Sequence, residues 1–342
     1  MYNKKILLIG SLPKENISQL GGATILMKSL KDYFDEKKVF HDFICLNEYP
    51  FSRFRSLIFV VFKYLQKVYK SDLVFINVST NGAFLVTPIL YLIGRFFSKK
   101  IVFRVFGSNF QKHFLDRNKV IRFFAKKTFF KSDLVIVETL YNQKFFLKNE
   151  AKEILILPNV RKRPKKDFKV NEFSKSFVFI SQVKINKGIL DIIQASQYLN
   201  KTYTIDVFGP LYDNLTKENI DNDIVTYKGV LKPEEVINKI ELYDVVLLPT
   251  YYYGEGHPGI LVEAMSLGKP IISTYWNSIE EIVDNNYNGF LVSIKSPLEL
   301  SESIKKFNEN NYKEMSMNSY KKFDFFDEEL VYKKLMIELA KV

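Results

Sequence analysis

Twelve short apolar runs, rich in β-branched and aromatic residues, recur along the chain between longer amphipathic or polar spacers. The first six lie at 5–10, 43–46, 73–78, 101–107, 134–139 and 154–158. The second six lie at 177–183, 203–209, 224–229, 245–249, 270–274 and 289–294. Runs without polar alternation are typical of strands covered on both faces, and helical spacers between strands are typical of parallel sheets. The pattern therefore predicts an α/β fold of two Rossmann-like, doubly wound parallel-sheet domains.

A charged segment at 159–176, interrupted by Pro164, separates the two series of strands. It predicts a linker between a domain over 1–165 and a domain over 172–325, with a terminal helix over 326–342. A chain of 342 residues also exceeds what one hydrophobic core usually organises. Open parallel sheets bind ligands at the carboxyl ends of their strands, so two sheets facing each other are expected to form one cleft that holds the site.

Composition indicates the cellular compartment in which the protein is expected. Cys45 is the single cysteine, which excludes an intramolecular disulfide and a thiolate zinc cage and fits a reducing environment. The apolar run at the start breaks at Gly10 and Pro13, too soon for a signal peptide. The apolar stretches 57–62 and 83–94 are shorter than the roughly 20 residues of a membrane span. We therefore expect a cytoplasmic protein without a transmembrane helix.

The net charge of +12 is unevenly distributed. Residues 1–170 hold 24 Lys and 8 Arg against 13 acidic residues, a net charge of +19, whereas residues 171–342 carry −7. Such a field attracts anionic partners, and charge alone leaves phospholipid, nucleic acid and a phosphorylated substrate open. The basic, aromatic segments 53–70 and 119–133 predict helices that attach to the inner face of the cell membrane. The alternative is core-facing helices whose lysines snorkel to water.

The segment 244–274 concentrates candidate chemistry. A strand ending at Pro249 leads into an aromatic, glycine-rich loop, and a helix is predicted to begin near Pro258. The first amides of such a helix form an anion site suited to a diphosphate. Glu255 and Glu263 can both reach one ligand there. The alternative, a surface loop whose glutamates complement the helix dipole, fits Glu263 poorly because it lies in an otherwise apolar helix.

This segment resembles the E-x7-E signature of retaining glycosyltransferase family four, whose fold is GT-B. The similarity runs through EGxPxxxxEAMxxGKPIIST and on to IEEIVDNNYNGFLV. The resemblance implies a metal-independent hexosyl transfer from a nucleotide-diphosphate sugar, with a UDP-sugar favoured and a GDP-sugar second, and no permanently bound cofactor. It implies that Glu255 contacts the donor sugar and Glu263 the ribose. His257 lies in the same loop and is predicted either to face the reacting sugar or to be solvated.

Further donor-site residues follow from the same resemblance. The run FISQVKINKGILDIIQA resembles the segment with which the family grips the diphosphate, and Lys187 is its matching cation. Gln182 stands where the family usually has arginine, so Lys184 or the helix amides must compensate. The remaining predicted donor-binding residues are loop residues, namely Gly21, Gly22, Gly209, Gly229, Val230, Gly256, Pro258, Gly259 and Ile260. For the isolated glycines an ordinary turn is the alternative.

The run VFRVFGSNFQKHFL resembles the part of the family's first domain that faces the acceptor. Arg104, Gly107 and His113 are its predicted acceptor-side residues, although a structural role is the alternative for His113. Phe106 occupies the place of the family's usual histidine. In relatives, the terminal helix packs back on this first domain.

We therefore predict a retaining transfer to a glycan acceptor, lipid-linked and used in surface polysaccharide synthesis. The acceptor attacks from the front face while Lys187 and the helix amides stabilise the leaving diphosphate. A nucleotide-sugar epimerase or hydrolase of the same fold is the second hypothesis, but no additional acid–base pair stands out. A nucleic-acid-binding protein is the third, and it leaves the glutamate loop unexplained. The DND run at 221–223 is better explained by turn chemistry than by a metal site.

Overall fold

The computed structural model describes residues 4–13, 22–48 and 53–342. The chain divides into two compact units, which are described separately. Unit 1 comprises Met1–Pro158 and Val331–Val342, and unit 2 comprises Asn159–Leu330. Among the described residues, no helix is both long enough and apolar enough to span a membrane.

Unit 1 is built on a parallel sheet of six strands in the order β2-β1-β3-β4-β5-β6. The strands are β1 (Ile6–Gly10), β2 (His41–Cys45), β3 (Leu73–Val78), β4 (Lys100–Val105), β5 (Leu134–Val137) and β6 (Ile154–Ile156). Almost every strand residue of β1 and β3–β5 is buried, as expected for strands covered on both faces. The predicted first sheet is confirmed.

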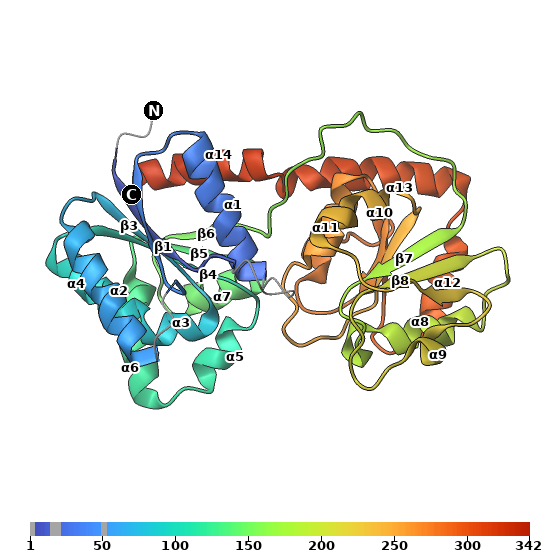
Figure 1. The fold of residues 1–342 in the computed structure, drawn as a ribbon, viewed down its shortest axis with the longest axis horizontal. Coiled ribbons are helices and arrows are strands. Elements are labelled where there is room, and N and C mark those ends of the chain that lie inside the picture. The colour runs from blue at the N-terminus through green and yellow to red at the C-terminus, as the bar shows by residue number, and fades with distance from the viewer. Residues whose placement is uncertain (1–3, 14–21, 49–52) are drawn as a thin grey trace. The chain divides into compact units, whose positions relative to one another are not determined.

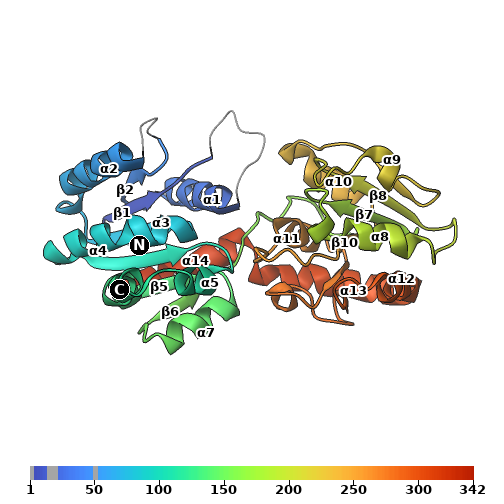
Figure 2. The same ribbon diagram turned by 90° about the horizontal axis from the view of Figure 1, so that it is seen from below.

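Helices cover both faces of this sheet (Figures 1 and 2). They are α1 (Gly22–Glu36), α2 (Arg53–Val68), α3 (Thr80–Leu85), α4 (Thr87–Phe96), α5 (Phe110–Leu115), α6 (Lys119–Lys127), the 3-10 helix η1 (Phe129–Lys131), α7 (Leu140–Lys148) and the terminal α14 (Glu328–Lys341). α14 packs against α1, because the Tyr332 ring contacts Tyr33 edge-on and its hydroxyl lies 2.8 Å from the Ser29 hydroxyl. The helix predicted over 119–133 ends at Lys127, where the backbone of Thr128 leaves the helical region.

Unit 2 contains a second parallel sheet, in the order β12-β11-β10-β7-β8-β9. Its strands are β7 (Ser176–Ile180), β8 (Thr204–Phe208), β9 (Val225–Tyr227), β10 (Val245–Leu248), β11 (Ile271–Thr274) and β12 (Gly289–Val292). The chain builds outward from β7 in one direction and from β10 in the other, which is the strand order of a dinucleotide-binding Rossmann sheet. The predicted fold class is thus confirmed for both sheets.

The helices of unit 2 form two layers. They are α8 (Ile189–Ser196), α9 (Lys217–Ile220), α10 (Val236–Glu241), α11 (Gly259–Ser266), α12 (Pro297–Lys306), α13 (Glu309–Lys322) and the 3-10 helices η2 (Ile185–Lys187), η3 (Pro233–Glu235), η4 (Ile279–Glu281) and η5 (Phe323–Phe325). α8 packs with α12 on one face of the sheet, and α11 packs with α10 and α13 on the other (Figure 1).

The strand order changes direction between the neighbouring strands β7 and β10. Ligands of open α/β sheets bind at such a switch point, at the carboxyl ends of the strands. The loop after β7 contains η2, and the loop after β10 leads into α11. Gly188 lets the two loops meet, because its φ is +85° and an added Cβ would lie 2.2 Å from the Pro249 carbonyl oxygen.

Candidate functional site

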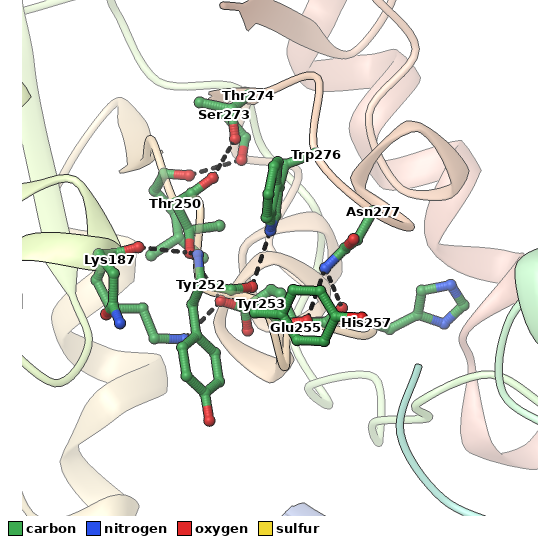
Figure 3. Close-up of polar contacts among 12 residues, drawn as sticks. Lys187, Thr250, Tyr252, Tyr253, Glu255, His257, Ser273, Thr274, Trp276 and Asn277 are labelled. Atoms are coloured by element: carbon green, nitrogen blue, oxygen red, sulfur yellow. Dashed lines mark hydrogen bonds and ion pairs between the residues drawn. The ribbon is translucent and has the colours of Figure 1, made fainter. Parts of the chain in front are cut away.

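Lys187 and Glu255 form an ion pair at this switch point (Figure 3). The Lys187 Nζ lies 2.5 Å from Glu255 Oε2, and the two side chains are only 12% and 9% exposed. The same carboxylate oxygen accepts a 2.9 Å hydrogen bond from the Thr250 hydroxyl. A pair with so little exposure is screened weakly by solvent, so both side chains are held in place. The structure thus brings together two of the predicted site residues and adds Thr250.

The sheet fixes Thr250. Its carbonyl oxygen accepts a hydrogen bond from the Thr274 hydroxyl at the end of β11, and the neighbouring Ser273 hydroxyl donates to the Leu248 carbonyl at 2.6 Å. The Thr250 hydroxyl also lies 3.3 Å from the Asn186 carbonyl of the β7 loop. Side chains of β11 therefore clamp the end of β10 beside the loop that carries Lys187 (Figure 3).

The aromatic loop is tied down by backbone and side-chain donors. Tyr251 donates its amide to the Asn186 carbonyl at 2.9 Å, and Lys187 Nζ lies 4.7 Å from the centre of the Tyr252 ring. The Trp276 indole donates to the Tyr252 carbonyl at 2.8 Å, and the Asn277 amide donates to the Glu255 carbonyl at 3.3 Å. Glu255 therefore sits in a braced turn, not on a free surface loop.

His257 is buried and points away from the Lys187–Glu255 pair (Figure 3). Its Nε2 lies 3.2 Å from Glu281 Oε2, and its ring meets Phe326 edge-on. Its carbonyl oxygen accepts a 2.7 Å hydrogen bond from the Asn159 side chain. The structure does not bring this histidine to the ion pair, and its predicted contact with the donor sugar stays a prediction.

Helix α11 begins at Gly259, directly after Pro258, as predicted. Glu263, in its second turn, accepts a 2.6 Å hydrogen bond at Oε1 from Arg161 Nε. A Cβ on Gly259 would lie 1.9 Å from Arg161 Nη2, so the glycine makes room for that guanidinium. Gly256 and Ile260 flank this turn, each half-buried. From the sequence, Arg161 lies in the linker and has no predicted role. Only the glycine at position 259 indicates that another group packs closely against the start of α11.

The loops after β7, β8 and β9 contain further residues that are predicted to bind the donor. Gln182 and Lys184 are half-buried, and Lys184 Nζ lies 4.2 Å from the centre of the Tyr212 ring. Gly209 is sterically required, because a Cβ there would lie 1.7 Å from the Ser181 carbonyl oxygen. At Gly229 nothing lies within 4 Å of such a Cβ, and Val230 is 64% exposed.

The DND run forms a turn. Asn222 Oδ1 accepts the amides of Ile224 and Val225, and Asp221 Oδ1 accepts the amide of Tyr227. Within the described ranges, no three His, Cys, Asp or Glu side chains gather as a metal site requires.

Burial raises the pKa values of two ionisable groups near the site. It raises the pKa of Asp191 in the first turn of α8, and the Lys295 ammonium opposes that rise. Burial also raises the pKa of Tyr251, and the charges of Asp191 and Asp213 add to the effect. Tyr251 therefore remains a neutral phenol at neutral pH.

The predicted acceptor-side residues belong to unit 1. Arg104 is buried at the end of β4, with its guanidinium 4.6 Å from the Phe106 ring, and burial lowers its pKa. Gly107 donates its amide to Glu138 at 3.0 Å, and His113 lies half-buried in α5. Gly22 is the first residue of α1, whereas Gly21 lies outside the described residues.

Residues 160–323 match the protein family described as Glycosyl transferases group 1. An uncharacterized glycosyltransferase of Methanocaldococcus jannaschii is 28% identical over 240 residues, which cover 64% of this chain and 61% of that protein. The N,N'-diacetylbacillosaminyl-diphospho-undecaprenol alpha-1,3-N-acetylgalactosaminyltransferase of Campylobacter jejuni is 24% identical over 130 residues, covering 37% of this chain and 34% of that protein. The chain thus spans at most about three-fifths of these relatives' lengths.

The fold has close counterparts among solved structures. A crystal structure of the Anabaena protein HepE in complex with UDP superposes with a TM-score of 0.74 at 16% identity, covering 99% of this chain and 100% of that chain. The same protein in complex with UDP-glucose gives a TM-score of 0.72. The two sheets and their helices thus form the GT-B fold, as the sequence predicts.

Proposed function

We propose that this protein is a retaining, metal-independent glycosyltransferase of family four that moves a hexosyl group from a nucleotide-diphosphate sugar to a glycan acceptor. The observation that carries the proposal is the Lys187–Glu255–Thr250 cluster at the switch point of the second sheet, one turn before helix α11. A cation, a braced carboxylate and the start of a helix are the groups that a sugar diphosphate needs.

The donor is held from both ends in this proposal. Lys187 leaves Glu255 to bind the diphosphate, and the freed carboxylate accepts hydroxyl hydrogen bonds from the sugar. The ribose is bound by Glu263, and Gly209, Gly229 and Val230 line the base. A UDP-sugar is favoured, which is supported by the UDP and UDP-glucose complexes of HepE. A GDP-sugar is the second candidate.

The reaction exchanges one C–O bond for another. The bond between the anomeric carbon and the diphosphate breaks, and the acceptor hydroxyl forms its bond on the same face. The hydroxyl proton passes to the departing diphosphate oxygen. Lys187 and the first amides of α11 stabilise the charge that develops on the leaving group.

The acceptor is proposed to be a lipid-linked glycan of surface polysaccharide synthesis, bound by unit 1 through the region of Arg104, Gly107 and His113. The Campylobacter relative, whose name specifies a diphospho-undecaprenol-linked sugar, supports this class of acceptor. A lipid-linked acceptor requires an enzyme at an anionic membrane surface, and the charge of +19 on residues 1–170 fits that location.

The side chains of α6 fit such a surface. Val120, Phe123 and Phe124 are 63%, 57% and 51% exposed. Beside them lies a groove of about 630 Å³, lined by aromatic rings and by cations that include Lys119, Arg122, Lys126 and Lys148. Exposed aromatic rings close to lysine and arginine side chains are typical of helices that lie in a membrane interface.

The test is a donor panel followed by product analysis. Thermal unfolding is measured with UDP, GDP and other nucleoside diphosphates, and the preferred sugar donor is then incubated with a panel of polyprenyl-diphosphate-linked sugars. We expect one nucleotide to stabilise the protein and the product to keep the donor's anomeric configuration in its proton NMR spectrum. No stabilisation by any nucleotide, or an inverted product, would refute the proposal.

A further inference from the structure

Arg161 is held against the start of α11 by a set of hydrogen bonds. Its Nε donates to Glu263 Oε1 at 2.6 Å, and its Nη1 donates to Asn159 Oδ1 at 2.5 Å and to the Val160 carbonyl at 2.9 Å. Its backbone is fixed as well, because its amide donates to the Phe326 carbonyl at 3.0 Å and its carbonyl accepts from the Glu328 amide. The guanidinium therefore has one defined position.

That position is unusual for a cation. Nη2 is the atom that a Cβ on Gly259 would meet at 1.9 Å, so it lies beside the first residue of α11. The start of a helix carries a partial positive charge, and a cation there is unfavourable by itself. An anion that contacts both the exposed edge of the guanidinium and the helix amides would be stabilised by both. Nη2 donates none of the three hydrogen bonds that position the side chain, so it is available to such an anion.

The two glutamates of the loop hold two cations in the same manner. Glu255 holds Lys187 at 2.5 Å before the helix, and Glu263 holds Arg161 at 2.6 Å within it. The side chains of Arg161 and Glu263 are 18% and 20% exposed, so this pair is reached by solvent at one edge. A nucleotide-diphosphate sugar carries a negative charge on each phosphoryl group, and Lys187 alone balances one of them.

We propose that Arg161 is a second diphosphate-binding residue of this site and that it supplies the charge missing at Gln182. This inference rests on the proposed function, since it names a further residue of the same donor site. Glu263 acts as a positioning residue through Oε1, and its other oxygen is used by none of the hydrogen bonds in the described ranges, which leaves it for a ribose hydroxyl. A fork of guanidinium N–H groups fits a diphosphate better than a single ammonium does.

The experiment removes the guanidinium at position 161 and then introduces one at position 182. Arg161→Gln removes the charge but keeps a hydrogen-bond donor for Glu263, and the double variant Arg161→Gln/Gln182→Arg returns one arginine to the site. Arg163→Gln is the matched control, because Arg163 lies in the same segment but pairs with Asp324 at 2.5 Å, beside the Tyr320 ring. UDP and GDP are titrated calorimetrically, and uridine and guanosine are measured by ligand-observed NMR as phosphate-free counterparts.

We expect Arg161→Gln to weaken binding of the preferred nucleoside diphosphate by about 10- to 100-fold, as expected for charge-assisted hydrogen bonds. Its nucleoside should bind as it does to the wild type, the double variant should recover at least about tenfold, and Arg163→Gln should not differ from wild type. Equal losses for nucleoside and diphosphate, or no recovery in the double variant, would show a structural role and overturn the inference. If the wild-type protein binds no nucleoside diphosphate, the proposed function fails as well. If Arg161→Gln binds the nucleoside diphosphate as tightly as the wild type does, this inference is refuted and the proposed function is not.

Discussion

At the scale of single residues, the proposed donor binding depends on Lys187, which forms an ion pair with Glu255 in the structure. We expect Lys187→Ala to abolish the thermal stabilisation by the preferred nucleoside diphosphate, because about 1.5–3 kcal/mol of charge-assisted hydrogen bonding is lost. The buried Glu255 also loses its cation, so the melting temperature without ligand should fall by a few degrees. Lys201→Ala is the control, since Lys201 lies in the same unit and pairs with the exposed Asp223. An undiminished shift in Lys187→Ala would remove Lys187 from the site.

Residues of this site can be predicted from sequence where one segment contains them or where a family motif marks them, as it marks Lys187. Glu255, Pro258, Gly259 and Glu263 lie on one loop and helix, and their spacing alone places them together. Arg161 meets Glu263 across 102 positions of sequence, and no local periodicity reports such a contact. Thr250 escapes notice for a different reason. Its hydroxyl matters only because β11 clamps its backbone beside the β7 loop.

At the scale of elements, Gly188 decides how closely the β7 loop approaches the β10 loop. In Gly188→Ala, the new Cβ lies on a residue of positive φ and only 2.2 Å from the Pro249 carbonyl oxygen. Relieving this clash requires the Pro249 backbone to move. Gly229→Ala is the matched control in the same unit, because its φ of +93° imposes similar strain and nothing lies within 4 Å. We expect Gly229→Ala to cost about 1 kcal/mol and Gly188→Ala at least about 2 kcal/mol of unfolding free energy. Chemical denaturation measures both, and equal losses would contradict the close approach.

Whole elements were more predictable than their ends. Every strand of both sheets overlaps a predicted apolar run, because most of these strands are buried on both faces and leave an uninterrupted hydrophobic signal. The helix predicted over 119–133 ends early, where the Thr128 hydroxyl donates to the Phe124 carbonyl at 2.6 Å. Such a side-chain bond competes with the helical pattern, and composition does not reveal it.

At the scale of the whole molecule, the topology of the second sheet places the candidate site, and the charge distribution is one ground for the proposed membrane location. The strand order cannot be predicted from any single apolar run, because it depends on where each connection places the next strand in the sheet. The unequal charge of the two halves is visible at once from sequence. The sequence leaves open whether the basic helices face the core or a membrane. In the structure, Phe123 and Phe124 of α6 are exposed, and Arg122 and Lys126 line a groove with Phe123, which supports the proposed membrane-facing role of this helix.

Binding to vesicles tests that arrangement. Wild-type protein should sediment with phosphatidylcholine vesicles that contain phosphatidylglycerol, bind weakly to vesicles that lack it, and dissociate as salt rises. Arg122→Glu/Lys126→Glu should weaken binding by about tenfold or more, because each cation contributes about 1 kcal/mol near an anionic surface. Phe123→Ser should weaken it by removing a ring that enters the interface.

Two controls separate this surface from overall charge and overall apolar exposure. Lys201→Glu/Lys305→Glu changes the net charge equally but lies in unit 2, and Leu242→Ser removes an apolar side chain of that unit that is 69% exposed. Both should bind vesicles as the wild type does. All four variants should keep the nucleotide-induced thermal shift, because none touches the Lys187–Glu255 cluster. If the charge variants of the two units lose binding equally, attraction is a property of net charge, and α6 is not the membrane-facing helix.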